Sequence, residues 1–180
     1  MSEVDIGWSE GAMEREDRVD VVWAAWRAAY PHIFSRSEID GIFEGSLEGE
    51  GSWVGARLAP AGTLAARRAG RLVGLAGLGL LRNGDGELAA LYVVPQLQGQ
   101  GIGSALWDRS LAELQGRACR RLEVWTLARS HARRFYEARG CIAFAEGSFT
   151  VAGHREVAVG YTRDISENAA ATLSESTPTR

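Results

Sequence analysis

The stretch from Leu91 to Ser104 constrains the fold of this 180-residue chain more than any other part of it. Four apolar residues, 91–94, are followed by Pro95, which has no N–H group to donate to a strand ladder, so we expect a strand to end there. Three glycines then alternate with other residues in Gly99-Gln100-Gly101-Ile102-Gly103, and an amphipathic pattern follows. The order strand, glycine-rich loop and helix is therefore predicted.

This loop predicts a site for a pyrophosphate. Helix N-termini expose unpaired N–H groups with a partial positive charge of about half a unit, and glycines let the backbone approach a ligand closely. A dinucleotide fingerprint would need glycine where Ser104 stands, and a P-loop would need a Lys-Ser or Lys-Thr pair that is missing. The alternative is that the glycines only form a tight turn and cap the helix.

The rest of the chain predicts one mixed α/β domain with a mostly antiparallel sheet flanked by helices, not a doubly wound parallel sheet. Helical periodicity or capping signals appear over 17–29, 101–115 and 130–139, and over a short segment opened by a capping box at Ser37 and closed by Gly45. Strands are expected over 4–8, 63–68, 71–81, 87–94, 121–126, 142–148 and 154–163. Residues 1–165 are assigned to this domain and 166–180 to a disordered tail.

Composition excludes several classes of protein. Twenty Lys and Arg against 23 Asp and Glu give a net charge of −3, which does not suit a general nucleic-acid binder. The longest apolar run, 72–81, falls short of the roughly 17–25 residues of a membrane span. The two cysteines form no disulfide framework, so a cytoplasmic protein is expected. The three histidines are isolated in sequence, and no metal is expected.

The segment Gln98-Gly99-Gln100-Gly101-Ile102-Gly103 resembles the acyl-coenzyme A loop of the GNAT N-acetyltransferase superfamily, which reads Gln or Arg, two residues, Gly, one residue, then Gly or Ala. The second GNAT signature, an aromatic pair, a spacer and a glycine, is matched by Phe135-Tyr136-Glu137-Ala138-Arg139-Gly140, with Cys141 replacing the usual final aromatic. Ala132, Phe135, Tyr136 and Arg139 share one helix face. The resemblance covers roughly 17–164 and implies the GNAT acyltransferase fold with acetyl-coenzyme A as cosubstrate.

The same resemblance implies which residues hold the cofactor. They come from the strand end, the loop and the second signature: Leu91, Tyr92, Val93, Gln98, Gly99, Gln100, Gly101, Ile102, Gly103, Ser104, Ser130, Ala132 and Phe135. Similar proteins commonly carry an Asn that contacts the pantetheine arm where this chain has Arg129. Ser130 or the backbone is the alternative contact.

The implied activity is N-acetylation of a primary amine by direct attack on the thioester. Only the free base attacks, and an alkylammonium has a pKa near that of lysine, about 10.4. Glu87 is the favoured base and Glu123 its rival, although either suits an outward-facing strand position. Tyr136 is the expected proton donor to the thiolate, unless it only packs beside Phe135. A backbone N–H near Tyr92 or Val93 would stabilise the oxyanion.

The acceptor side is less specific. Trp26 and Tyr30, with Trp23, form an aromatic stripe that either floors an acceptor pocket or packs in the core. Glu44, Glu48 and Glu50 either attract a cationic amine or are simply solvated. The acceptor, a small-molecule or peptide amine, stays open, and the fold allows a homodimer. A non-catalytic acyl-coenzyme A binding or regulatory module is the alternative function.

Overall fold

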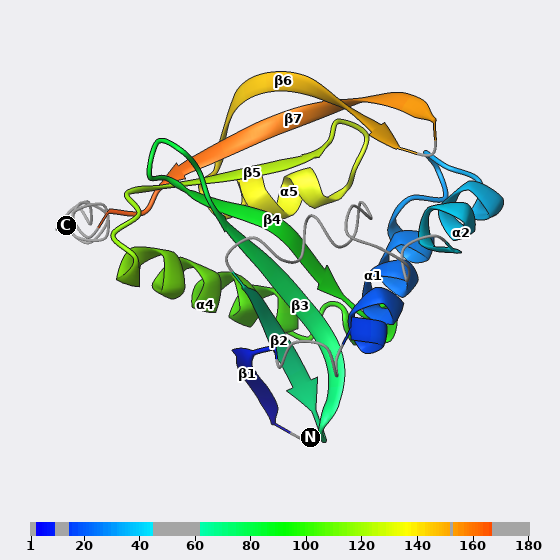
Figure 1. The fold of residues 1–180 in the computed structure, drawn as a ribbon, viewed down its shortest axis with the longest axis horizontal. Helices are drawn as coiled ribbons and strands as arrows, with labels where there is room; N and C mark the ends of the chain where they lie inside the picture. The colour runs from blue at the N-terminus through cyan, green and yellow to red at the C-terminus, as the bar shows by residue number, and fades with distance from the viewer. Residues whose placement is uncertain (1–2, 10–14, 45–61, 152, 167–180) are drawn as a thin grey trace, which may run out of the picture.

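The computed structural model describes residues 3–9, 15–44, 62–151 and 153–166, in which helices flank one twisted sheet (Figure 1). The elements in chain order are β1 (Val4–Trp8), α1 (Arg15–Ala29), α2 (Arg36–Glu44), β2 (Thr63–Arg68), β3 (Arg71–Leu80), β4 (Gly86–Val93), the 3-10 turn η2 (Pro95–Leu97), α4 (Ile102–Gly116), β5 (Arg121–Leu127), α5 (Ala132–Glu137), β6 (Ile142–Val151) and β7 (His154–Asp164). This arrangement confirms the predicted mixed α/β class. The boundary expected at residue 165 stays a prediction, because 167–180 lie outside the described residues.

The seven strands run in the order β1-β2-β3-β4-β5-β7-β6, and every neighbouring pair is antiparallel except β4 and β5. That parallel pair is held in register at only two positions, Gly86 with Leu122 and Glu87 with Glu123. Beyond these positions the two strands diverge, with α5 beside the opening (Figure 1). The sheet is therefore open along one internal edge of β4.

A bulge on β4 lies where this opening begins. Gly77 of β3 pairs with Ala90, whereas the next residue, Leu78, pairs with Leu88, so Ala89 is an extra residue on β4. A bulge of this kind bends its strand and increases the local twist. The bulge therefore favours the divergence of β4 from β5.

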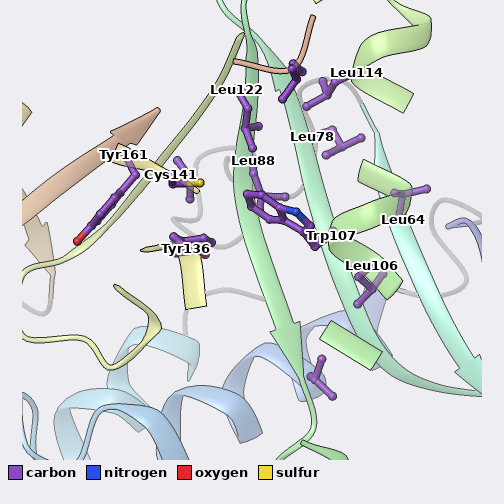
Figure 2. Close-up of a cluster of buried hydrophobic side chains, with 14 of the residues drawn as sticks. Leu64, Leu78, Leu88, Leu106, Trp107, Leu114, Leu122, Tyr136, Cys141 and Tyr161 are labelled. Carbon is purple, nitrogen blue, oxygen red and sulfur yellow. The ribbon is translucent and has the colours of Figure 1, made fainter. Parts of the chain in front are cut away.

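Two apolar clusters cover the two faces of the sheet. On one face Leu106, Trp107 and Leu114 of α4 pack against strand residues such as Leu78 and Leu88. Figure 2 shows this cluster, with Tyr136, Cys141 and Tyr161 at one end and Leu64 and Leu106 at the other. On the opposite face α1 and α2 bury a second cluster that includes Trp26, Phe34, Ile39, Phe43, Leu75 and Ala90. Burial of these faces is the main apolar driving force for the fold.

The capping box predicted at Ser37 is wrong by two residues. The Ser35 N–H donates to Glu38 Oε2 at 2.7 Å, and the Glu38 N–H donates to Ser35 Oγ at 3.3 Å. This reciprocal pair is the capping box of α2, which begins at Arg36. The sequence offers Ser at both 35 and 37, and the acidic residue three positions after Ser35 is a glutamate, which has the longer reach.

Candidate active site

The glycine-rich loop presents a row of free backbone donors. Among the residues that the structure describes, no carbonyl accepts a hydrogen bond from any N–H group of residues 99–104, whereas the next one, of Ala105, donates to the Gly101 carbonyl at 3.0 Å. Gly99 and Gly101 have φ values of 73° and 84°, in the left-handed region that favours glycine. A Cβ at either position would meet nothing within 4 Å. The loop therefore forms an open cradle of donors that suits an anion.

The side chains of the loop hold it in place. Gln98 Nε2 donates to the Val93 carbonyl at 3.0 Å, which ties the loop back to the end of β4. Gln100 Oε1 accepts from Arg68 Nη1 on β2 at 2.9 Å, and the Ile102 side chain is buried in the core. The conformation of the cradle is thus fixed from three sides.

A cavity of about 680 Å³, here called the larger cavity, lies against this loop. Of the residues predicted to hold the cofactor, all line the larger cavity except Gln100 and Ile102. Its wall also includes Ala25, Ala28, Ala29, Tyr30, His131, Tyr136 and Arg139. The structure therefore brings the strand end, the loop and α5 together around one space, as the two sequence signatures indicated.

A second cavity of about 60 Å³, here called the smaller cavity, lies where β4 and β5 diverge. Its lining comes from α1, β4, β5, α5 and β6: Trp26, Tyr30, Leu88, Ala89, Ala90, Leu91, Tyr92, Val124, Trp125, Thr126, Leu127, Ala132, Tyr136, Phe149 and Val151. Five residues border both cavities: Tyr30, Leu91, Tyr92, Ala132 and Tyr136. The two cavities therefore meet at the divergence of the strands, beside Tyr136.

Tyr136 is 7% exposed and contacts the rings of Trp107 and Tyr161 (Figure 2). It also contacts the ring of Phe135. Burial, with the neighbouring phenols of Tyr30 and Tyr92, raises the pKa of Tyr136 above its ordinary value. No residue in the described part of the chain forms a hydrogen bond with its hydroxyl. A buried, protonated phenol at the junction of the two cavities is able to donate to a ligand atom there.

The backbone of β4 offers a donor at the same place. The Val94 N–H donates to the Val73 carbonyl on β3 at 2.9 Å. Because hydrogen-bonding groups alternate in direction along a strand, the N–H of Val93 points away from β3 and that of Tyr92 points toward it. Of the two positions suggested for an oxyanion donor, only Val93 therefore presents its N–H to the open edge of β4.

Glu87 and Glu123 lie side by side in the short parallel pairing of β4 and β5. Neither residue is among those that line the two cavities. Burial raises the pKa of Glu123, with the negative charges of Asp85 and Glu87 adding to the effect and Arg121 opposing it. The two carboxyls are thus neighbours at the closed end of the divergence, beyond direct contact with either cavity.

Arg129 and Ser130 lie in the segment before α5, where similar proteins commonly carry an Asn. Arg129 turns toward β7, where its Nη2 donates to both carboxylate oxygens of Glu156 at 2.9 and 3.0 Å. Ser130 is buried, lines the larger cavity, and accepts from the Ala132 N–H at 3.1 Å. Ser130 thus lies at the larger cavity, and its role as the contact in place of the Asn, like that of the backbone, stays a prediction.

Arg139 is a site residue that the sequence reasoning did not assign. Its guanidinium lies 3.5 Å from the centroid of the Phe135 ring, and its Nη2 donates to Ser104 Oγ at 2.5 Å. It lines the larger cavity beside the glycine-rich loop. The signal was present, because the spacing of Arg139 from Ala132, Phe135 and Tyr136 predicted a shared helix face, although α5 ends at Glu137 and Arg139 lies in the following turn.

Of the three aromatic residues predicted to form a stripe, two line a cavity and the third contacts α2. Trp26 and Tyr30 line the smaller cavity, and Trp26 Nε1 donates to the Tyr92 hydroxyl at 3.1 Å. Trp23 instead donates to Asp40 Oδ1 of α2 at 2.9 Å and borders neither cavity. Glu44 is exposed at the end of α2. Glu48 and Glu50 lie outside the described residues.

The described part of the chain offers three further observations, on a thiol, on metal-ligating side chains and on helix length. Burial raises the pKa of the Cys141 thiol to about 11, which disfavours the nucleophilic thiolate. No group of three or more His, Cys, Asp or Glu residues that could hold a metal ion is found there. Within the same residues, no helix combines the length and apolar character needed to cross a membrane.

Residues 19–141 match the profile of the Acetyltransferase (GNAT) family. A curated relative, the uncharacterized N-acetyltransferase YuaI of Bacillus subtilis (strain 168), is 29% identical over 144 residues, which cover 76% of this chain and 81% of the relative.

Solved structures show the same fold. A GCN5-related N-acetyltransferase from Rhodopseudomonas palustris superposes with a TM-score of 0.74 at 21% identity, covering 91% of this chain and 97% of the other. PaiA N-acetyltransferase from Thermoplasma acidophilum, solved in complex with coenzyme A, gives 0.63 at 14% identity, covering 90% and 99%. The ribosomal-protein-S18-alanine N-acetyltransferase from Escherichia coli gives 0.60 at 19% identity, covering 91% and 95%.

Proposed function

The chain belongs to the GNAT family and is an acyltransferase, and we propose that it transfers an acetyl group from acetyl-coenzyme A to a primary amine in a ternary complex. One observation carries this proposal: the larger and smaller cavities meet at the divergence of β4 and β5, beside Tyr136, which lines both. Such a junction lets two substrates enter from two sides and meet at one reacting centre.

The larger cavity fits the coenzyme A part of this cosubstrate, which supplies the thioester. The unpaired N–H groups of residues 99–104 suit the oxygens of a pyrophosphate. The Arg139 guanidinium adds positive charge beside them. Ser130 and the open edge of β4 near Val93 offer hydrogen-bond partners to a polar arm that runs from the loop toward Tyr136.

The residues at the junction then have distinct roles. The Val93 N–H donates to the thioester oxygen, on which negative charge develops as the amine nitrogen forms its bond to the carbonyl carbon. Tyr136 donates its proton to the sulfur as the carbon–sulfur bond breaks, so that the thiol leaves neutral. The phenol regains a proton from solvent after the products depart.

The proton that the amine loses needs an acceptor. We propose Glu87 for this role, acting through water because its carboxylate borders neither cavity. Glu123, its neighbour across the strand pairing, is the rival. Glu87→Gln would then lower turnover most at acidic pH, where the amine is hardest to deprotonate. If only Glu123→Gln does so, the base is Glu123.

Two further proposals concern compartment and assembly. Cys119 and Cys141 are free and buried, which suits the reducing cytoplasm. The outer strand β6 exposes Ile142 and Phe144, and we propose this edge as the contact of a homodimer. Sedimentation of the wild type and of an Ile142→Lys variant tests the second proposal, because the variant should be monomeric.

The central experiment is a thiol-release assay with acetyl-coenzyme A and a panel of primary amines. We expect release that depends on one or more amines, with mass spectrometry identifying the N-acetyl product. Tight binding of coenzyme A with no turnover on any amine would instead indicate a binding or regulatory module.

A further inference from the structure

We propose that the acceptor is a small aliphatic primary amine whose carbon chain carries no second charge. This inference rests on the proposed function, since it treats the smaller cavity as the place where the amine binds. It is drawn from the lining of that cavity, its size, and the way in which the neighbouring charged groups are already paired.

The lining of the smaller cavity is aromatic and aliphatic. Its rings come from several elements: Trp26 of α1, Tyr30 directly after α1, Tyr92 of β4, Trp125 of β5 and Phe149 of β6, with Tyr136 of α5 at the junction. Among the described residues that line it, none is Asp, Glu, Lys, Arg or His. Side-chain polarity is limited to hydroxyls and indole N–H groups, and the Trp26 N–H already donates to Tyr92.

Packing fixes these rings in position. A Cβ at Gly160 would lie 2.8 Å from the Trp125 ring, and one at Gly147 would lie 3.0 Å from it. Trp125 therefore packs closely over two glycines of the β6–β7 hairpin. The Trp26 and Tyr30 rings meet edge to face at 4.7 Å. Such a wall cannot easily rearrange to bring a charged partner to the ligand.

Three pairs of charged groups lie in the described neighbouring elements. Arg129 pairs with Glu156, His154 contacts Glu38, and Arg27 lies 3.4 Å from Asp40. A second charge on the acceptor would thus be removed from water without a partner in the lining, which is strongly unfavourable. Specificity here comes from exclusion, as in other sites where an unpaired charge penalises the wrong ligand.

The same lining favours the reactive form of a simple amine. Removal from water disfavours the ammonium ion, and so lowers the pKa of the bound amine toward neutrality. The aromatic faces offset part of this effect by attracting the cation as it enters. A base that acts through water, such as Glu87, is then sufficient to remove the proton.

Size narrows the class further. A volume of about 60 Å³ holds only a few non-hydrogen atoms, whereas a cavity that admits benzene measures about 150 Å³. A short alkyl chain fits this space, whereas an aromatic ring would extend beyond it.

Three amines with the same four-carbon chain test the inference: butylamine, 1,4-diaminobutane and 4-aminobutanoate. We expect kcat/KM for butylamine to exceed that of both charged analogues by about tenfold or more, because their second charge is buried unpaired. Equal or better turnover of either charged analogue overturns the inference. No turnover of butylamine by protein that still binds coenzyme A also overturns it and leaves the proposed function standing. Loss of coenzyme A binding would contradict the proposed function itself.

A charged variant provides the second arm. Phe149→Glu places a carboxylate in the lining and should shift the kcat/KM ratio toward 1,4-diaminobutane by about tenfold. Thr150→Glu, exposed and outside both cavities, makes the same change in net charge one residue away and should leave the ratio unchanged. If the kcat/KM ratio shifted equally in both variants, the change would reflect net charge alone. That result would contradict the proposal that the cavity lining selects the acceptor.

Discussion

At the scale of single residues, three phenol groups converge where the two cavities meet: Tyr30, Tyr92 and Tyr136. The Tyr92 hydroxyl accepts a hydrogen bond from Trp26, whereas the Tyr136 hydroxyl has no hydrogen-bond partner in the described residues. The Tyr136 hydroxyl is therefore not engaged by another described side chain, whereas the Tyr92 hydroxyl is already hydrogen-bonded.

Tyr136→Phe removes that proton while keeping the ring. We expect kcat to fall by about 100-fold, the lower range for loss of a general acid, with little change in coenzyme A affinity. Thiol-release kinetics and a binding titration measure the two quantities. Tyr161→Phe is the matched control, because its hydroxyl bonds to Arg133 and Glu137 and borders neither cavity. Equal losses in both variants would contradict the assignment.

Glu123 gives a pH-dependent prediction for stability. Its pKa is raised by burial and nearby negative charge, so the folded state holds the carboxyl proton more tightly than the unfolded state. Ionised Glu123 therefore lowers the free energy of unfolding progressively as pH rises above its ordinary pKa. Glu123→Gln should raise Tm at neutral pH and have a smaller effect near pH 4, the ordinary carboxyl range. A larger gain in acid than at neutral pH would contradict this.

At the scale of elements, the capping box of α2 separates two serines that look alike in sequence. Ser35→Ala removes the acceptor of the Glu38 N–H and should cost about 1 kcal/mol in the free energy of unfolding. Ser37→Ala, inside the helix, should be close to neutral or slightly stabilising. Denaturant unfolding of the two variants measures the difference. A larger loss for Ser37→Ala would contradict the observed cap.

Gly160 and the Trp125 ring form the second element-scale test. In Gly160→Ala the new Cβ would lie 2.8 Å from the Trp125 ring and 2.9 Å from the Phe144 ring, so we expect a loss of about 1–3 kcal/mol from overpacking. Because Trp125 lines the smaller cavity, the KM for the amine should rise as well. Gly7→Ala is the control, since its Cβ would meet nothing within 4 Å. Indifference to Gly160→Ala would contradict the packing described for Trp125.

The elements themselves were largely predictable, because periodicity and turn residues are local signals. The strands and α-helices of the described residues were all expected near their observed positions, although the strand predicted to end at residue 148 continues to Val151. That extension matters, since Phe149 and Val151 line the smaller cavity. Local pattern does not show that β7 inserts between β5 and β6, because strand order depends on pairings between distant segments.

Site residues that belong to a sequence motif were predictable. Site residues that only the fold brings together were less so. The loop and α5 signatures indicated the larger cavity, yet not that Gln98 holds the Val93 carbonyl. The choice of the Val93 N–H over the Tyr92 N–H as oxyanion donor depends on which of the two points away from β3, and this follows from the strand pairing. Trp125 was not expected near the acceptor, because its position depends on close packing against Gly147 of β6 and Gly160 of β7, which are distant in sequence.

At the scale of the whole molecule, one open strand edge organises the function that we propose. The parallel pairing of β4 and β5 stops after Glu87 and Glu123, and both cavities lie beyond it. The α4 side of the sheet supplies the anion cradle at the N-terminus of that helix, and the α1 side supplies Trp26 and Tyr30. In the function that we propose, cofactor binding and acceptor selection therefore meet at Tyr136.

The most direct test of this account is a calorimetric titration with coenzyme A of the wild type, Gly101→Glu and Gly84→Glu. The two glycines have the same φ of 84°, and a Cβ at either meets nothing within 4 Å, so both variants carry similar backbone strain and the same added charge. We expect Gly84→Glu to bind like the wild type and Gly101→Glu to lose about 100-fold or more in affinity, because its carboxylate repels the pyrophosphate. Unchanged affinity in Gly101→Glu, or no binding by the wild type, would contradict the assignment of the glycine-rich loop.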